Sequence, residues 1–201
     1  MATVGKVDMR TQDTKPDTRT PRRMRRAAGF TLIEAALTTV IVGTGVLAII
    51  SAQQAYHMKN NWATRTTTGM LLANEVREMT FRMPLHDPIT KKTTIGPEAD
   101  EASVVAFDDL DDFAGVVTSG QGAGTTFDPP VNALRQEVGD LAGWSQVVTV
   151  ESVLPDYIDA PVPQNLGTTG VMRVSVQVFF QPIDRSQPEA ITRLTWVVTD
   201  D

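Results

Sequence analysis

The fold of this chain is decided by residues 22–50, RRMRRAAGFTLIEAALTTVIVGTGVLAII. A cluster of arginines ends at Gly29, and the 21 residues that follow, 30–50, carry Glu34 as their only charge. A helix of that length crosses the roughly 30 Å hydrocarbon core of a bilayer. Because the basic residues lie on one side only, the positive-inside rule predicts a cytoplasmic N-terminus and places the rest of the chain across the membrane.

Glu34 is the informative residue of this segment. A carboxylate near one end of a spanning helix costs a few kcal/mol by insertion scales, so it usually has a partner or a function. The competing interpretation is an interfacial carboxylate that reaches back to the lipid headgroups and has no function.

Residues 29–34, GFTLIE, with the basic flank before them, closely resemble the type IV prepilin signature of pilins and type II secretion pseudopilins. The resemblance implies that a prepilin peptidase cuts between Gly29 and Phe30 and that Phe30 is then N-methylated. It makes Glu34 the assembly carboxylate. The implied partners are other pilin or pseudopilin subunits, the prepilin peptidase/methyltransferase and an inner-membrane assembly platform.

The physics of an assembled bundle agrees with that role for Glu34. Cleavage would create a cationic amine at Phe30, and Glu34 of one subunit could neutralise the amine of its neighbour, where lipid leaves little competition from water. The expected location is the inner membrane, with a single pass, a cytoplasmic N-terminus and a periplasmic C-terminal domain.

Residues 1–29 are expected to form the leader, and its first 21 residues show no hydrophobic period. Met24 is a second candidate start that would leave a short leader. An ordinary signal peptide carries its cleavage site after the apolar core. Here the recognisable site precedes the apolar run, so the span is expected to stay in the mature protein.

Charge and cysteine content exclude several functions. Of the 18 Lys and Arg residues eight precede Phe30, but only three of the 24 Asp and Glu residues do, so the remaining chain has a formal charge of −11. Such a surface disfavours nucleic acid, whose binding depends on cations that neutralise phosphates. The absence of cysteine excludes disulfides, thiolate catalysis and cysteine-based metal sites.

The helix is expected to continue past the membrane segment, residues 30–51, through an amphipathic segment, 52–84, because no proline occurs from Phe30 to Met83 and Pro84 supplies a stop. Small or apolar residues, interrupted by Arg65, recur at steps of three and four, which predicts a face that packs on a core. The stripe consists of Ala55, Met58, Trp62, Arg65, Gly69, Leu72, Val76, Met79 and Met83.

Residues 85–201 read as a β-rich periplasmic domain, with short β-branched runs between turn residues. Strands are predicted at 172–180, 190–198 and 144–153, with a weaker one at 103–107, and the first two should form a hairpin. In the second run, Ala190, Leu194, Trp196 and Val198 are expected on one face. The predicted class is α+β: a long N-terminal helix packed on an antiparallel sheet, which is also the pilin fold.

The acidic run Asp108, Asp109, Asp111 and Asp112 is the one constellation that could hold a metal, and calcium is the ion that clustered carboxylates favour. The spacing does not match an EF-hand loop, so a solvated acidic loop is the competing interpretation and no cofactor is expected. Residues 107–115 and 143–150 are also similar to the minor pilin D type of the mannose-sensitive haemagglutinin pilus. That resemblance indicates a subfamily, but it implies no chemical activity or ligand.

No enzymatic motif is found, so the chain is predicted not to be an enzyme. The glycine-rich residues 119–126 lack the Lys-Ser/Thr end of a phosphate loop, and neither His57 nor His86 has metal-ligand spacing. Within the pilin-like class, a pseudopilin of the I type is the second candidate. Two further hypotheses are a signal-anchored enzyme or ligand-binding domain, and a tip adhesin that binds through residues 119–142.

Overall fold

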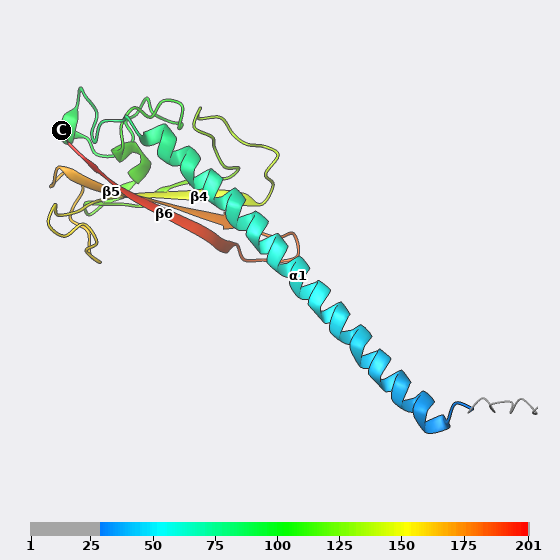
Figure 1. Cartoon of the computed structure of the whole chain (residues 1–201). Coiled ribbons are helices and arrows are strands. Elements are labelled where there is room, and N and C mark those ends of the chain that lie inside the picture. Colours follow the sequence, from blue (N-terminus) through cyan, green and yellow to red (C-terminus); the bar gives the residue numbers. More distant parts are fainter. Residues whose placement is uncertain (1–28, 201) are drawn as a thin grey trace, which may run out of the picture. The chain divides into compact units, whose positions relative to one another are not determined.

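The computed structural model describes residues 29–200, and the chain divides after Ile50 into two compact units. Helix α1 runs from Leu32 to Thr80 and is the long helix of Figure 1. The predicted helix is therefore confirmed, and it ends shortly before Pro84, as the steric restriction on residues preceding proline favours. The predicted leader lies outside the described residues except for Gly29.

The start of α1 is fixed by a local side-chain cap. The backbone N–H of Glu34 donates to Thr31 Oγ1 at 3.3 Å, and the N–H of Ala35 donates to the Thr31 carbonyl at 3.0 Å. Thr31 is thus the N-cap and Glu34 the third helical residue, the T-x-x-E spacing of a capping box. The acidic side chain also lies where the helix dipole favours negative charge.

The first unit contains the apolar part of α1, whose side chains are exposed in the single chain. Every described residue up to Ile50 is exposed, including Leu32 at 89% and Ile33 at 77%. Within residues 29–200, α1 is the one helix long and apolar enough to cross a membrane. An apolar surface of this size needs a bilayer or other apolar helices to cover it.

The second unit is built on a four-stranded antiparallel sheet in the order β3-β4-β5-β6. The strands are β3 (Thr125–Phe127), β4 (Trp144–Ser152), β5 (Val171–Phe180) and β6 (Glu189–Thr199). A small separate hairpin pairs β1 (Val117–Thr118) with β2 (Gln121–Gly122). The three stronger strand predictions and the β5–β6 hairpin are confirmed, and with them the α+β class.

The weaker prediction, a strand at 103–107, is wrong. This segment turns, with the N–H of Ala106 donating to the Ser103 carbonyl at 2.9 Å, and Val105 is 67% exposed. A short apolar run without a neighbouring strand gains nothing from an extended conformation.

A register shift between Val178 and Phe179 changes the predicted face of β6. Val178 lies opposite Thr192, but the next residue, Phe179, lies opposite Ala190. Ile191 is therefore partly buried against the core and Ala190 is exposed, the reverse of the expected alternation at this end of the strand. One extra residue in a strand has this effect because side chains alternate with a period of two.

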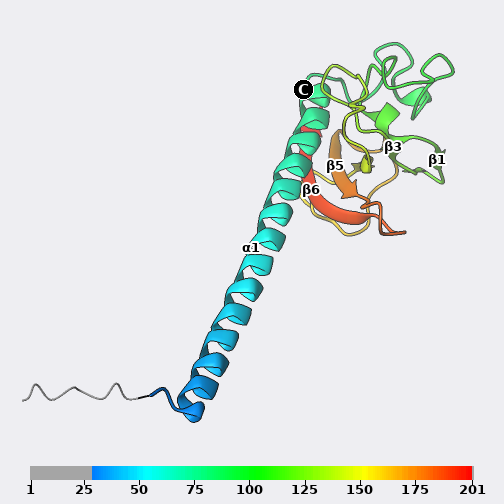
Figure 2. The same cartoon turned by 90° about the vertical axis from the view of Figure 1, so that its right-hand side faces the viewer.

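The C-terminal part of α1 packs on the core side of this sheet, alongside β6 (Figure 2). Leu72, Ala73 and Val76 belong to the same buried core as the valines of β4 and β5. A Cβ on Gly69 would lie 3.0 Å from Ile191 Cγ2, so glycine permits the close approach of helix and strand. The predicted stripe is correct from Gly69 to Met79 and wrong before it, because Ala55, Met58 and Trp62 are exposed; its last member, Met83, packs on the core but lies past the end of α1.

One buried polar side chain ties helix, sheet and loop together. Gln146 on β4 is fully buried, and its Nε2 donates to the Leu72 carbonyl of α1 at 2.8 Å. Its Oε1 accepts the N–H of Val131 at 2.8 Å, and its Nε2 also donates to the Val131 carbonyl at 3.1 Å. The loop before β4 is thereby fixed to the helix through Gln146, and Glu75 of α1 adds a second connection by accepting the N–H of Ala133 at 2.7 Å.

Candidate functional site

Two regions carry candidate functional residues, and the first is the start of α1. A Cβ on Gly29 would meet nothing within 4 Å, and Phe30 is 70% exposed. The Glu34 carboxylate is exposed and has no hydrogen-bond or ion-pair partner within residues 29–200. The three residues thus lie within about one and a half helical turns of each other on an open segment.

The second region is an acidic cluster in the connection between α1 and β1. It is centred on the 3-10 helix η2 (Asp111–Ala114), which is anchored because Leu110, Phe113 and Ala114 are fully buried. A second 3-10 helix, η1 (Lys91–Thr93), lies earlier in the same connection. The apolar anchor holds Asp109, Asp111 and Asp112 inside the domain, whereas Asp108 is exposed.

Asp109 and Asp112 each use one carboxylate oxygen to hold the turn. Asp109 Oδ1 accepts the N–H groups of Asp111 and Asp112 at 2.7 and 3.2 Å. Asp112 Oδ2 accepts the N–H groups of Asp108 and Asp109 at 2.9 and 3.2 Å. The other oxygens, Asp109 Oδ2 and Asp112 Oδ1, are buried without a hydrogen-bond partner.

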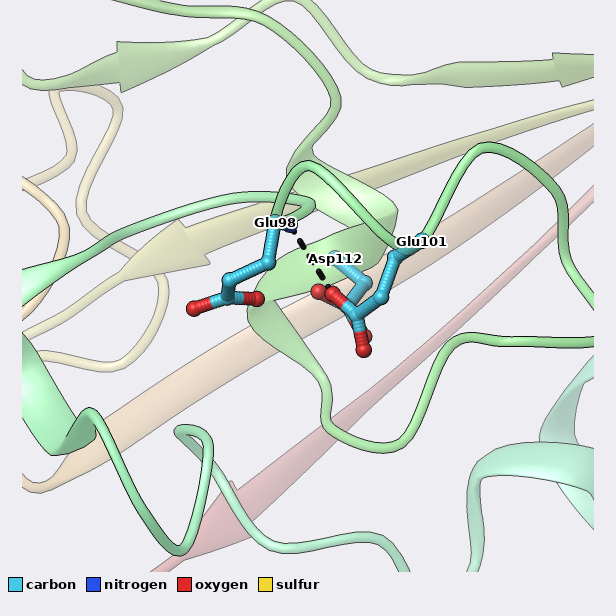
Figure 3. A group of neighbouring side chains, drawn as sticks. All are labelled: Glu98, Glu101 and Asp112. Atoms are coloured by element: carbon cyan, nitrogen blue, oxygen red, sulfur yellow. Dashed lines mark hydrogen bonds between the residues drawn. The ribbon is translucent and has the colours of Figure 1, made fainter.

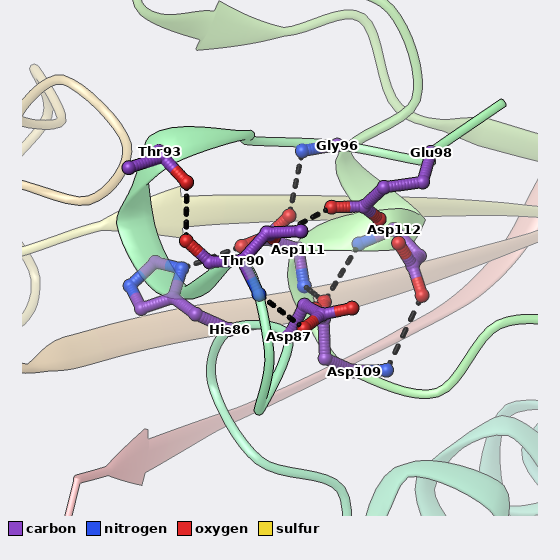
Figure 4. Close-up of polar contacts among 9 residues, drawn as sticks. All are labelled: His86, Asp87, Thr90, Thr93, Gly96, Glu98, Asp109, Asp111 and Asp112. Carbon is purple, nitrogen blue, oxygen red and sulfur yellow. Dashed lines mark hydrogen bonds and ion pairs between the residues drawn. The ribbon is translucent and has the colours of Figure 1, made fainter.

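Asp111 has both oxygens occupied (Figure 4). Its Oδ2 lies 2.5 Å from Nδ1 of His86, and its Oδ1 accepts the N–H of Gly96 at 2.6 Å. Both side chains of the pair are buried. Asp111 therefore serves the packing of the loop, and it holds His86 through Nδ1 alone.

Glu98 and Glu101 bring two further carboxylates to Asp112 (Figure 3). One oxygen of each of the three lies within 4.8 Å of the others, and a second group of the same kind joins Asp108, Asp109 and Asp112. The N–H of Glu98 donates to Glu101 Oε2 at 2.9 Å, and Glu98 Oε1 accepts from the Thr90 hydroxyl at 3.0 Å. Glu98 Oε2 is buried without a partner.

No lysine or arginine within residues 29–200 forms an ion pair with these carboxylates. The ion pairs of arginine there are Arg173 with Glu151 and Arg185 with Glu189, both remote from the cluster. Burial, together with the charges of Asp111 and Asp112, raises the pKa of Asp109 to about 8. Burial also raises the pKa of Glu98, Glu101, Asp108 and Asp112.

The raised pKa of Asp109 predicts a stability that falls with pH when no metal is present. The protonated form is favoured by the fold, so its contribution is complete below the unfolded value of 3.8 and is lost as the pH rises through about 8. The slope for one group is up to about 1.4 kcal/mol per pH unit. Urea unfolding in EDTA, followed by tryptophan fluorescence, should give a lower free energy of unfolding at pH 8 than at pH 5.

Asp109→Asn is the matching control, because it removes this titration and should flatten the pH profile. A wild-type profile that rises from pH 5 to pH 8 would contradict the prediction. The other raised carboxylates act in the same direction, so some slope should remain in the variant.

The sequence therefore identified part of this cluster. Asp108, Asp109 and Asp112 belong to the two carboxylate groups, whereas Asp111 belongs to neither and is held by His86. Glu98 and Glu101 were missed because they precede the acidic run by several residues and the loop brings them back. The competing interpretation, a solvated acidic loop, is wrong for Asp109, Asp111 and Asp112, which are at most 1% exposed.

The remaining candidates carry no catalytic arrangement among the described residues. His86 and Asp111 form a buried pair, and His86 Nε2 is buried without a hydrogen-bond partner among the described residues. Residues 119–126 contain β2 and the start of β3 rather than a phosphate loop. His57 is exposed, and its ring packs edge-to-face on the Tyr56 ring.

Comparisons with known proteins add no relative. No family model matches the chain, and neither a curated protein nor a solved structure matches it.

Proposed function

We propose that this protein is a structural subunit of a type IV pilin-like filament, either a minor pilin or a type II secretion pseudopilin. In this proposal the prepilin peptidase cuts between Gly29 and Phe30 and methylates the new amine. The subunit then waits in the inner membrane, with its C-terminal domain in the periplasm, until the assembly platform adds it to a filament.

The observation that carries the proposal is a bare apolar helix with one unpaired carboxylate in its first turn. The side chains of residues 29–50 are exposed, and Glu34 has no partner within the described chain. In a spanning helix that merely anchors a domain, a charge at this position serves only the helix start, and it costs free energy in lipid. A bundle of such helices, each with a cationic N-terminus, supplies a partner for it.

Thr31 supports the same assignment. Its cap fixes the start of α1 two residues after the proposed cleavage site. After cleavage Phe30 would therefore be a single residue before the N-cap, and the new amine would lie within about one turn of the Glu34 carboxylate along the chain. An axial stagger of about one turn between neighbouring subunits would then bring the amine of one beside the Glu34 carboxylate of the next.

Intact mass and N-terminal sequencing of the protein purified from its own membranes test this proposal. We expect a mature chain that begins with N-methylated Phe30. An uncut chain from cells with an active prepilin peptidase would contradict it, and a signal-anchored periplasmic domain would take its place. Gly29→Leu should block the cut, because a branched side chain replaces the small residue at the cleavage site.

A further inference from the structure

Strand β6 is the last strand of the four-stranded sheet and has a neighbour, β5, on one side only (Figure 1). It is 11 residues long and contains neither proline nor glycine. An edge strand of this length presents a row of unpaired N–H and C=O groups, which can pair with another strand. The free edge of β6 is therefore a surface that needs an explanation.

The hydrogen-bond pattern shows which backbone groups of β6 point to the free edge. The N–H of Asp200 donates to the Gly170 carbonyl at 2.9 Å, directly after the last pair of the β5–β6 ladder. Hydrogen-bonded and non-hydrogen-bonded pairs alternate along an antiparallel ladder, so the even-numbered residues of β6 bond to β5. The N–H and C=O groups of Arg193, Thr195 and Val197 thus point away from β5, and within residues 29–200 they have no further backbone partner.

The same three residues line a groove of about 580 Å³ on the outer face of the sheet. Residues 158–161 form its opposite wall, which is fixed to β5 because Arg173 Nη1 donates to the carbonyls of Ile158 and Ala160, each at 3.1 Å. The Nε and Nη2 groups of Arg173 donate to Glu151 Oε2 at 3.0 and 2.7 Å. Both walls of the groove are therefore held in place by contacts within the domain.

Arg193 is the cation that this groove leaves without an ion pair. Its Nη2 donates to Ser175 Oγ at 3.2 Å, and the Ser175 hydroxyl lies 2.9 Å from Thr195 Oγ1. Arg193 forms no ion pair within residues 29–200, although Asp159 lines the same groove. An exposed guanidinium with unused donors, next to two hydroxyl groups, is suited to binding a carboxylate.

A second, smaller groove of about 270 Å³ flanks β6 on the helix side. It is lined by Arg77, Phe81 and residues 196–199. Phe81 is 68% exposed, and Arg77 forms no ion pair within the described chain. Because successive side chains of a strand point to opposite faces, a strand added at this edge would place them alternately in the two grooves.

We propose that the free edge of β6 binds an extended, acidic segment of a partner protein, which extends the sheet by one strand. Main-chain hydrogen bonds to Arg193, Thr195 and Val197 would provide affinity, and carboxylates facing Arg193 and Arg77 would provide selectivity. A second copy of this chain fits less well, since residues 190–199 would bring another arginine and no carboxylate. The surface lies within the second unit, so this inference does not depend on the proposed filament role.

The probe is a fluorescently labelled octapeptide of alternating glutamate and valine, titrated with the full chain in detergent micelles and followed by fluorescence anisotropy. We expect saturable binding with a Kd below about 1 mM. A lysine–valine octapeptide should bind about fivefold more weakly or worse, because it places like charges opposite Arg193. Hydrogen exchange at the amides of Arg193, Thr195 and Val197 should slow when the glutamate–valine peptide is bound, because these N–H groups gain acceptors.

Two variants separate the charge from the edge. Arg193→Glu should reverse the preference between the two peptides, and the basic residues before Phe30 cannot cause this reversal because they are the same in both proteins. Val197→Pro removes one N–H from the free edge without removing a hydrogen bond to β5, so it should weaken binding of the glutamate–valine peptide. Val197→Ala is its matched control, since it keeps the N–H and should retain most of the affinity.

Three results would overturn the proposal. One is the absence of saturable binding of the glutamate–valine octapeptide up to about 1 mM. Another is an equal affinity of the wild type and Arg193→Glu for that peptide. The third is exchange at β6 that slows with rising protein concentration in the absence of peptide, which would make a second copy the occupant of the edge.

Discussion

Replacing Gln146 with leucine should lower the free energy of unfolding of the domain by about 2–4 kcal/mol. Leucine has nearly the same size, so the loss comes from hydrogen bonding rather than from a cavity. The buried N–H of Val131 would lose its acceptor, and the carbonyls of Val131 and Leu72 would lose a donor. The loop before β4 and the helix would then have no polar connection through this strand.

Gln177→Leu is the matched control for this prediction. Gln177 lies on β5, opposite Val147 on the other face of the sheet, is only partly buried and has no side-chain hydrogen bond in the described structure. Its replacement should change the free energy of unfolding by less than about 0.5 kcal/mol. Urea unfolding of the full chain, followed by tryptophan fluorescence, measures both. Equal losses in the two variants would show that the Gln146 network contributes nothing specific.

Gln146 also illustrates what the sequence contained but did not reveal. Alternation along β4 places it on the same face as Trp144 and Val148, and all three are buried. A polar residue on the inward face of a predicted strand is a signal for a buried hydrogen-bond network. Its partners could not be found that way, because Leu72 and Val131 lie on a helix and in a loop that only the tertiary fold brings together.

Long periodic segments could be predicted because local physics decides them. The apolar run and the absence of proline between Phe30 and Met83 account for the length of α1, and alternation accounts for β5 and most of β6. The periodic stripe, however, indicates only that a face is apolar. It does not say what covers that face, and so Met58 and Trp62 are exposed in the single chain while Val76 is in the core.

The acidic cluster likewise shows that a sequence pattern reveals a candidate site only where its residues are neighbours along the chain. The run around Asp109 was visible because its members are neighbours in sequence. Its burial depends on Leu110 and Phe113, whose anchoring in the core is a tertiary property. Glu98 and Glu101 belong to the cluster because the loop folds back toward Asp112. Asp111 is not a member, because its Oδ2 pairs with Nδ1 of His86.

The second large effect is expected at Glu34, where glutamine should reduce incorporation into filaments at least tenfold. Glutamine keeps the size, the polarity and the T-x-x-E/Q pattern of the capping box, so α1 should still begin after Thr31. Only the charge is lost. A tenfold effect corresponds to about 1.4 kcal/mol, less than a close ion pair gains where water is scarce.

The measurement compares the amount of subunit in sheared filaments with the amount in the membrane. Glu78→Gln is the control on the same helix, because Glu78 is exposed and its side chain makes no hydrogen bond or ion pair within residues 29–200. It should assemble as the wild type does, and both variants should be cleaved and inserted normally. Since the Glu34→Gln chain retains its cap and its apolar surface, normal assembly of this variant would mean that Glu34 serves the helix start alone. The charge pairing on which the filament model depends would then be wrong, even if the cut at Gly29 occurs.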